Sequence, residues 1–205
     1  MKRFDVSMTI FEDMQVYNNQ PSKKPVFEIV ADFDKQTYHE TNITMNVHTG
    51  THMDFPLHMI RDGENSSSLV LDRLIGTVKV FDLTDKDVID KEAVELLPIA
   101  PHDNVFFKTR NSFSESFDKA FVYMKHDAAD YLSELSLNIV GVDGLGVERG
   151  QPGHPTHHAL MEADTYIIEG LRLKDIDAGI YFMYALPLKI EGMDALPMRV
   201  ILESI

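Results

Sequence analysis

The feature that most limits the fold is a series of short runs rich in β-branched and aromatic residues, which is typical of β-strands. Several of these runs follow one another with no helical pattern between them, so the chain is not a simple repeat of strand–helix–strand units. The predicted strands are Val26–Val30, Ile43–His48, Val78–Leu83, Asn104–Thr109, Ala120–Met124, Ile139–Val142, Tyr166–Ile168, Gly179–Tyr184 and Met198–Leu202.

Helical patterns are fewer and shorter than the strand patterns. The spacing of apolar residues predicts helices over Lys91–Leu97, Ala128–Ser136 and Thr156–Ala163. Thr156 is the expected cap of the third helix, because Pro155 disfavours an earlier start. Strands with interspersed helices predict an α/β domain with a mixed sheet, either open or curled toward a barrel.

Composition narrows the class of protein further. The chain has 205 residues, with no low-complexity linker and no internal repeat, so we expect a single domain over residues 1–205. A formal net charge of −14 argues against a nucleic acid or an anionic membrane as partner, because both require a basic face.

Two further absences bear on location and chemistry. The first residues, MKRFDVSMTIFEDM, contain no continuous apolar run typical of a signal peptide, and no stretch is long and apolar enough to span a membrane. We therefore expect a cytoplasmic protein. The chain contains no cysteine, so any metal must be held by imidazole and carboxylate groups.

The stretch VHTGTHMDFPLH, residues 47–58, carries three histidines and an aspartate. In an extended chain, alternate residues share a face, which would place His48, His52 and Asp54 on one side. A helix would turn Asp54 about 240° away from His48, and Gly50 and Pro56 also disfavour a helix. The pattern favours a strand running into a tight loop. A metal site and a hydrogen-bonded polar network both remain open at this point.

A second cluster lies in GHPTHHALMEADTYIIEGL, residues 153–171. Glu169 ends an apolar strand, where α/β folds usually place their chemistry. A short helix, a turn at residues 163–164 and a returning strand would bring His157 back to Glu169. Glu162 is interpreted as a solvated residue on the helix face, whereas His154 and His158 are interpreted as helix caps or substrate contacts.

These residues resemble a known family. HTGTHMDFPLH is similar to the HxGTHxDxPxH signature of the cyclase-type metal-dependent hydrolases, which include bacterial kynurenine formamidase and isatin hydrolase. HHALMEADTYIIEGL is similar to the second motif of that family. The resemblance implies a swivelling β/β/α domain around a barrel-like sheet. It also implies a homodimer or homotetramer.

The resemblance also implies roles for individual residues. The implied metal ligands are His48, His52, Asp54, His157 and Glu169, and the implied catalytic residue is His58. Five ligands are more than one tetrahedral zinc ion uses, so we expect two zinc ions bridged by Asp54, or one manganese ion of higher coordination number. The chain lacks the tryptophan of the kynurenine enzymes. Tyr17, Phe55 and His158 are therefore the expected substrate contacts.

The implied activity is hydrolysis of the C–N amide bond of a small molecule by hydroxide generated at the metal, with N-formylkynurenine as the expected substrate of an arylformamidase. Opening of a lactam or lactone ring, as in isatin hydrolase, is the alternative. A non-catalytic metal-binding protein is the second alternative. His58 disfavours it, because a purely structural site needs no additional histidine beside the ligands.

Overall fold

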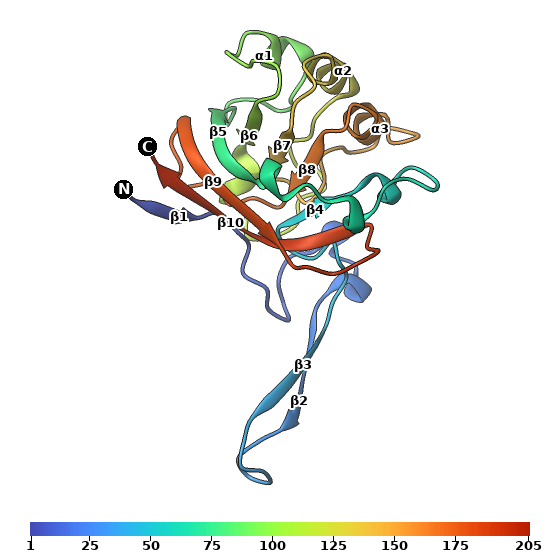
Figure 1. Cartoon of the computed structure of the whole chain (residues 1–205), viewed down its shortest axis with the longest axis vertical. Helices are drawn as coiled ribbons and strands as arrows, with labels where there is room; N and C mark the ends of the chain where they lie inside the picture. The colour runs from blue at the N-terminus through green and yellow to red at the C-terminus, as the bar shows by residue number, and fades with distance from the viewer.

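A computed structural model describes residues 1–205, and its centre is a mixed sheet that closes on itself (Figure 1). The strand order is β1-β10-β4-β8-β7-β6-β5-β9, and β9 pairs again with β10, so seven strands form a ring with β1 outside it. The strands are β1 (Arg3–Asp5), β4 (His52–Asp54), β5 (Ile75–Asp82), β6 (Asn104–Lys108), β7 (Ile139–Val142), β8 (Tyr166–Glu169), β9 (Gly179–Pro187) and β10 (Ala195–Ser204). The predicted α/β fold with a mixed, barrel-like sheet is confirmed.

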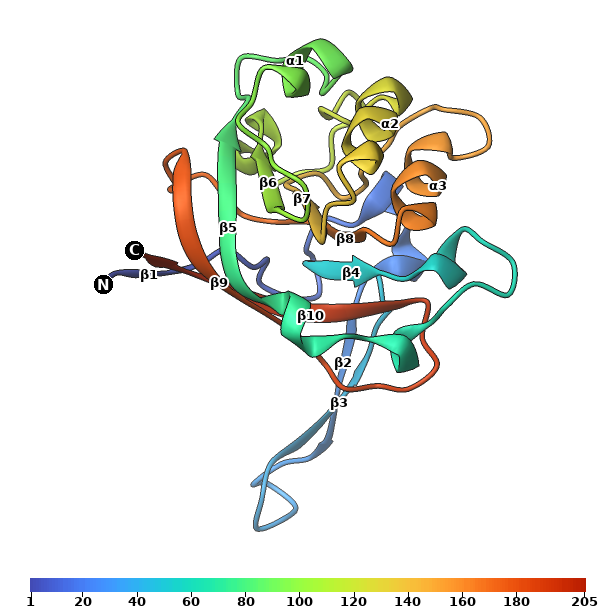
Figure 2. The same ribbon diagram turned by 45° about the horizontal axis from the view of Figure 1, so that its top comes forward.

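All three predicted helices are present, with ends shifted by one or two residues. They are α1 (Lys91–Glu95), α2 (His126–Glu134) and α3 (Pro155–Glu162), and they lie together beside the parallel strands β5 to β8 (Figure 2). Short 3₁₀ turns are Tyr17–Asn19, Pro21–Lys23, Pro56–His58, Ser66–Ser68, Leu71–Leu74 and Arg110–Phe113. No helix combines the length and the apolar character needed to cross a membrane.

The predicted cap of α3 is wrong. The helix begins at Pro155, one residue before Thr156, and His154 precedes it with a left-handed φ of 52°. Proline suits the first helical position because its φ is already close to the helical value and its missing N–H would have no partner there. Thr156 is fully buried inside the helix, and its hydroxyl donates to the carbonyl of Met124.

Two apolar cores lie on the two faces of the closed sheet. One fills its interior and includes Met53 and Phe55, whereas the other lies between the sheet and the three helices. Phe55 is completely buried and packs edge-on against Tyr166, so the prediction that it contacts substrate is wrong. The alternation that turns His52 and Asp54 to one side of β4 turns Met53 and Phe55 to the other.

Two predicted strands differ from the structure. The run predicted as Ile43–His48 is strand only to Thr44, after which the chain turns. The run predicted as Ala120–Met124 forms a single bridge between Met124 and Ile89 instead of a strand. The strand that ends at Thr44 is β3 (Glu40–Thr44), and it pairs with β2 (Val26–Ala31) in a hairpin that projects from the body (Figures 1 and 2). We call residues 26–44 the arm.

Candidate metal centre

The candidate metal centre lies where β4 pairs with β8. The antiparallel register places His52 directly opposite Glu169, so the two side chains share a face of the sheet. The Nε2 atom of His52 is 3.4 Å from a carboxylate oxygen of Glu169 and 3.4 Å from Oδ1 of Asp54. Residues more than a hundred positions apart in the sequence are therefore brought together by strand register.

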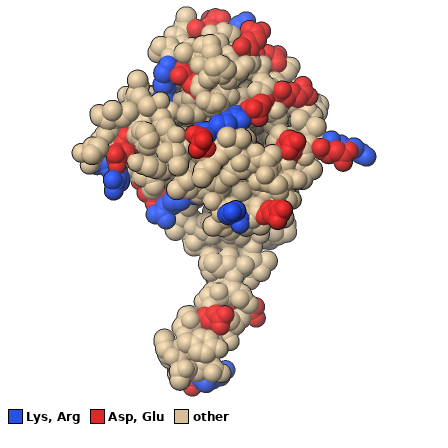
Figure 3. All heavy atoms as spheres, in the orientation of Figure 1, with Lys and Arg blue, Asp and Glu red and all other residues tan.

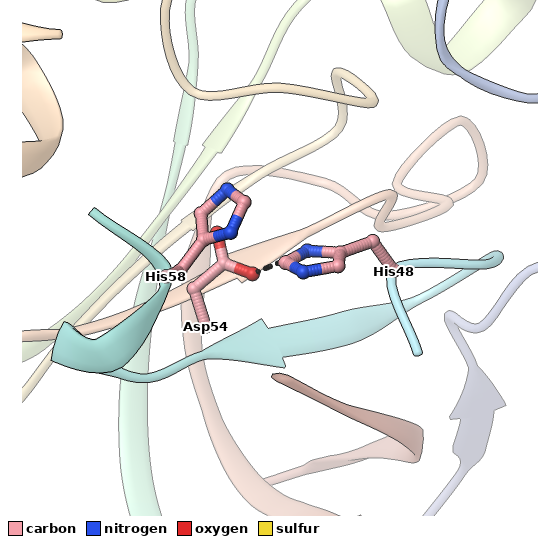
Figure 4. A group of neighbouring side chains, drawn as sticks. All are labelled: His48, Asp54 and His58. Atoms are coloured by element: carbon pink, nitrogen blue, oxygen red, sulfur yellow. Dashed lines mark ion pairs between the residues drawn. The ribbon is translucent and has the colours of Figure 1, made fainter. Parts of the chain in front are cut away.

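His48 lies on a turn, so the prediction that a strand carries it is wrong. Its side chain nevertheless lies beside those of His52 and Asp54, as predicted. Gly50 has a left-handed φ of 72°, which reverses the chain between His48 and β4. The Nδ1 atom of His48 is 3.0 Å from Oδ1 of Asp54 (Figure 4). The hydroxyl of Thr51 donates to the carbonyl of Gly170 at 2.6 Å, which fixes the turn to the end of β8.

His157 enters the group from α3, above the strands. Its Nε2 atom is 3.7 Å from Oδ2 of Asp54 and 3.5 Å from Oε1 of Glu169. The chain takes the predicted route: α3 ends at Glu162, a turn follows, and β8 returns to Glu169. The structure thus brings together all five residues predicted as ligands.

Three atoms in this group test whether a cation fits. Nε2 of His52 and both carboxylate oxygens of Asp54 are buried and form no hydrogen bond, although buried polar atoms almost always have a partner. The opposite ring nitrogens are occupied: Nδ1 of His52 lies 2.9 Å from the carbonyl of Gly50, and Nδ1 of His157 lies 2.7 Å from Glu148. Metal-binding histidines are held in this way, so the donor set fits a divalent cation.

The electrostatics of the group also favour positive charge. Burial raises the pKa of Asp54, but the neighbouring imidazoles of His157, His48 and His52 outweigh it and hold that pKa well below its usual range. Burial and the Asp54 charge raise the pKa of Glu169, but the neighbouring imidazoles of His157 and His52 bring it to about 2. Both carboxylates are therefore ionised at neutral pH. Their negative charge must be balanced by protonated imidazoles or by a bound cation.

His58 lies at the edge of this group on the turn after β4. Its ring centroid is 4.2 Å from that of His48 (Figure 4). The ring centroid of His157 lies 5.8 Å away from it. Burial lowers the pKa of His58, which leaves the imidazole neutral at neutral pH. A neutral imidazole beside a metal site can accept a proton.

Sequence reasoning missed two acidic residues of the site. Asp194, in the loop before β10, has Oδ2 at 2.9 Å from Nε2 of His48 and at 3.6 Å from Nδ1 of His58. Glu148, in the loop between β7 and α3, is buried and contacts His157. No motif marks either residue. For Asp194 the only available signal was the pairing of β10 with β4, which cannot be inferred from one sequence.

A cavity of about 390 Å³ opens above the group. Its lining residues are Tyr17, Lys23, His48, His52, His58, Met59, Leu145, Gly146, Glu148, Gly150, His154, His157 and Glu169. Tyr17 therefore lies where a substrate contact was predicted. His158 does not line the cavity, and its ring is 3.5 Å from the exposed Glu162, one turn along α3. The helix turns it to the outer side, so that prediction is wrong.

Glu148 holds His157 in place, and its replacement by glutamine tests this. Glu148 contacts Nδ1 of His157, and Nε2 of the same ring faces Asp54 and Glu169. Loss of the Glu148 charge should therefore weaken metal binding about 10- to 100-fold. Titration of the metal-free protein against a chromophoric chelator measures the affinity. Glu162→Gln on the exposed face of the same helix is the matched control and should bind as the wild type does. Unchanged affinity in Glu148→Gln would show that the contact does not orient His157.

Fold and site together define a barrel-like α/β protein with a buried imidazole–carboxylate centre beneath a cavity. The model of the family described as putative cyclase matches residues 4–149, and the chain belongs to this family.

Relatives and solved structures support the same assignment. A kynurenine formamidase from Salinibacter ruber is 30% identical, with 100% of this chain and 98% of the relative covered. A kynurenine formamidase from Bacillus cereus is 28% identical over 80% of this chain and 79% of its own length. A potential metal-dependent hydrolase with cyclase activity superimposes with a TM-score of 0.93 at 46% identity, over 98% of this chain and 96% of the other. Isatin hydrolase A from Labrenzia aggregata shares the fold, with a TM-score of 0.80 at 22% identity. The superposition covers 98% of this chain and 93% of the other.

Proposed function

We propose that this protein is a metal-dependent hydrolase that cleaves the C–N bond of a small amide, with an N-formyl aryl amine such as N-formylkynurenine as substrate. The observation that carries the proposal is the buried cluster with unpartnered ligand atoms of His52 and Asp54, placed beneath a cavity beside His58. The names of the two kynurenine formamidase relatives support the choice of substrate class.

The residues that would hold the metal are His48, His52, Asp54, His157 and Glu169. A bound divalent cation supplies positive charge that polarises a carbonyl and lowers the pKa of water. The two oxygens of Asp54 face different histidines, Oδ1 toward His48 and His52 and Oδ2 toward His157. Asp54 would therefore contribute to holding two zinc ions, which we propose in preference to one manganese ion.

His58 moves the proton in the proposed reaction. Its neutral imidazole accepts a proton from the attacking water and then donates it to the leaving amine, which departs only when protonated. The carboxylate of Asp194, 3.6 Å from Nδ1, stabilises the imidazolium formed between these two steps. Because the leaving group of a formanilide is an aromatic amine, the proton delivered by His58 is needed for it to depart.

The aromatic part of the substrate would lie against Tyr17. This ring packs edge-on against Phe117 and Phe121, at centroid distances of 5.4 and 6.3 Å, which fixes it as one wall of the cavity. The Lys23 ammonium lies 5.3 Å from the same ring and also lines the cavity. It can pair with a carboxylate carried by the substrate.

Activity against a small panel tests the proposal. The protein is stripped of metal, reloaded with zinc or manganese, analysed for metal content, and assayed with formanilides, N-formylkynurenine, isatin and a lactone. We expect two zinc ions per chain and turnover of the N-formyl substrates alone. Turnover of isatin or the lactone instead would establish ring opening. Full metal content with no turnover would leave a metal-binding protein that is not an enzyme.

A further inference from the structure

One half-buried arginine has no partner for its positive charge. On the face of the body that Figure 3 shows, most lysine and arginine side chains lie beside acidic ones. Arg172, in the segment that leaves β8, differs, because its guanidinium forms no hydrogen bond and no ion pair. Every other arginine has a partner except Arg61, which is exposed. Partial burial of an unpaired cation carries a desolvation cost that a bound anion would offset.

Two carboxylates act on Arg172 from a distance and do not neutralise it. Burial lowers the pKa of its guanidinium, although the charges of Glu115 and Asp143 raise it. Asp143 is buried, and its carboxylate accepts hydrogen bonds from the loop that follows β6. Glu115 is exposed, so water and salt screen its charge. The guanidinium of Arg172 therefore keeps its donors free.

Arg172 lines a cavity of about 430 Å³, a volume within the range of small-molecule sites. Met8, Phe11 and Met14 form its apolar wall, and the exposed Lys174 also lines it. No residue lines both this cavity and the catalytic cavity, so the two are separate. The cavity lies beside loops that follow β6 and β8, and ligands of α/β folds commonly bind outside the carboxyl ends of strands.

The walls of this cavity are held by contacts within the fold. The backbone N–H of Met8 donates to the hydroxyl of Thr51 at 2.8 Å, and the backbone N–H of Arg172 donates to the carbonyl of Val6 at 2.8 Å. Phe11, in contrast, is 51% exposed on the apolar wall. The cavity is thus formed before any ligand enters, which lowers the entropic cost of binding.

The chemistry of the lining favours a carboxylate that carries an apolar group. A guanidinium pairs with a carboxylate through two parallel hydrogen bonds, and the apolar wall would cover a hydrocarbon or aromatic group. Three acidic residues also line the cavity: Asp5, which is paired with Arg199, and the exposed Glu115 and Asp175. They repel a doubly charged phosphate more strongly than a singly charged carboxylate.

We propose that this cavity binds a small organic carboxylate with an apolar group, the carboxylate pairing with Arg172 and the apolar group lying against Phe11. Lys174 adds a second positive charge beside the ligand. Arg172 follows Glu169 by three residues, so a bound carboxylate also holds the segment that continues from this candidate metal ligand. The proposal concerns binding alone and does not depend on the reaction at the metal centre.

Calorimetric titration of the metal-loaded protein tests the proposal. The probes are phenylacetate, acetate and inorganic phosphate. We expect phenylacetate to bind most tightly, because it alone occupies both the charged and the apolar part of the cavity. Absence of phenylacetate binding, or tighter binding of phosphate, would overturn the proposal.

Arg172→Met tests where phenylacetate binds, because a carboxylate can also bind a metal ion. Loss of the charged pair should weaken phenylacetate binding about 10- to 100-fold, with metal content and circular dichroism unchanged. Arg61→Met, at the exposed arginine, is the matched control and should bind as the wild type does. Equal binding by Arg172→Met and the wild type would place the carboxylate elsewhere and exclude this site.

Phe11→Ser tests the apolar wall at a side chain that is largely exposed, so the fold does not depend on it. It should weaken phenylacetate binding about 5- to 10-fold and leave acetate binding unchanged, because only phenylacetate buries apolar surface there. Phenylacetate binding as tight as in the wild type would contradict the proposed position of the ligand.

Discussion

Asp54→Ala is expected to lose its metal and to hydrolyse amides more than about a thousandfold more slowly than the wild type, because the charge that activates water goes with the cation. The reason is structural: both oxygens of Asp54 are buried without a hydrogen-bond partner, between histidines on either side. Metal analysis and kcat/KM measure the two losses.

Thermal unfolding gives an independent measure of the same change. A ligand at about a thousand times its dissociation constant adds about 4 kcal/mol to the stability of the folded state. A chelator should therefore lower the melting temperature of the wild type and leave that of Asp54→Ala unchanged. Asp72→Ala, at an exposed carboxylate, is the control and should behave as the wild type. Stoichiometric metal in Asp54→Ala would exclude a bridging role for this carboxylate.

His58→Ala is expected to keep its metal and to lose about 10²- to 10⁴-fold in kcat, with little change in KM, because proton transfer fails while binding remains. The ring sits at the edge of the cluster, with its Nδ1 nearest to Asp194 and not to Asp54 or Glu169. Added imidazole should partly restore the rate by diffusing into the space left by the side chain.

His126→Ala, which removes a half-exposed imidazole from α2, is the control for that measurement. It should change neither rate nor metal content. Loss of metal from His58→Ala would identify His58 as a ligand, and full activity without metal loss would remove it from the reaction.

The parts of the site predicted from sequence are those set by local periodicity. The alternation of β4 brought His52 and Asp54 to one face. The helical spacing before an apolar strand placed His157 and Glu169 on a helix and strand that return to one point. The same alternation, extended by one residue, assigns Phe55 to the core. It therefore argues against the prediction that Phe55 contacts the substrate.

The parts that could not be predicted depend on pairing across long stretches of sequence. Asp194 reaches His48 because β10 pairs with β4, and the contact spans 146 positions. His48 depends on a turn whose shape is set by the φ of Gly50, which alternation does not describe. The arm resembles any other pair of strands in sequence, since only the folded structure shows that its apolar face lies against nothing.

The three-residue strand β4 has a consequence for how this chain can change in evolution. It lies between β8 and β10, and its register sets which side chains face each other. A slip of the whole strand by one residue, as an insertion just before it would cause, would turn the histidine and the aspartate into the apolar interior and a methionine and a phenylalanine out to the cavity. Insertions in the arm meet no such constraint, so descendants of this sequence are free to vary the length of their hairpin, whereas the segment from His48 to Asp54 must keep its length.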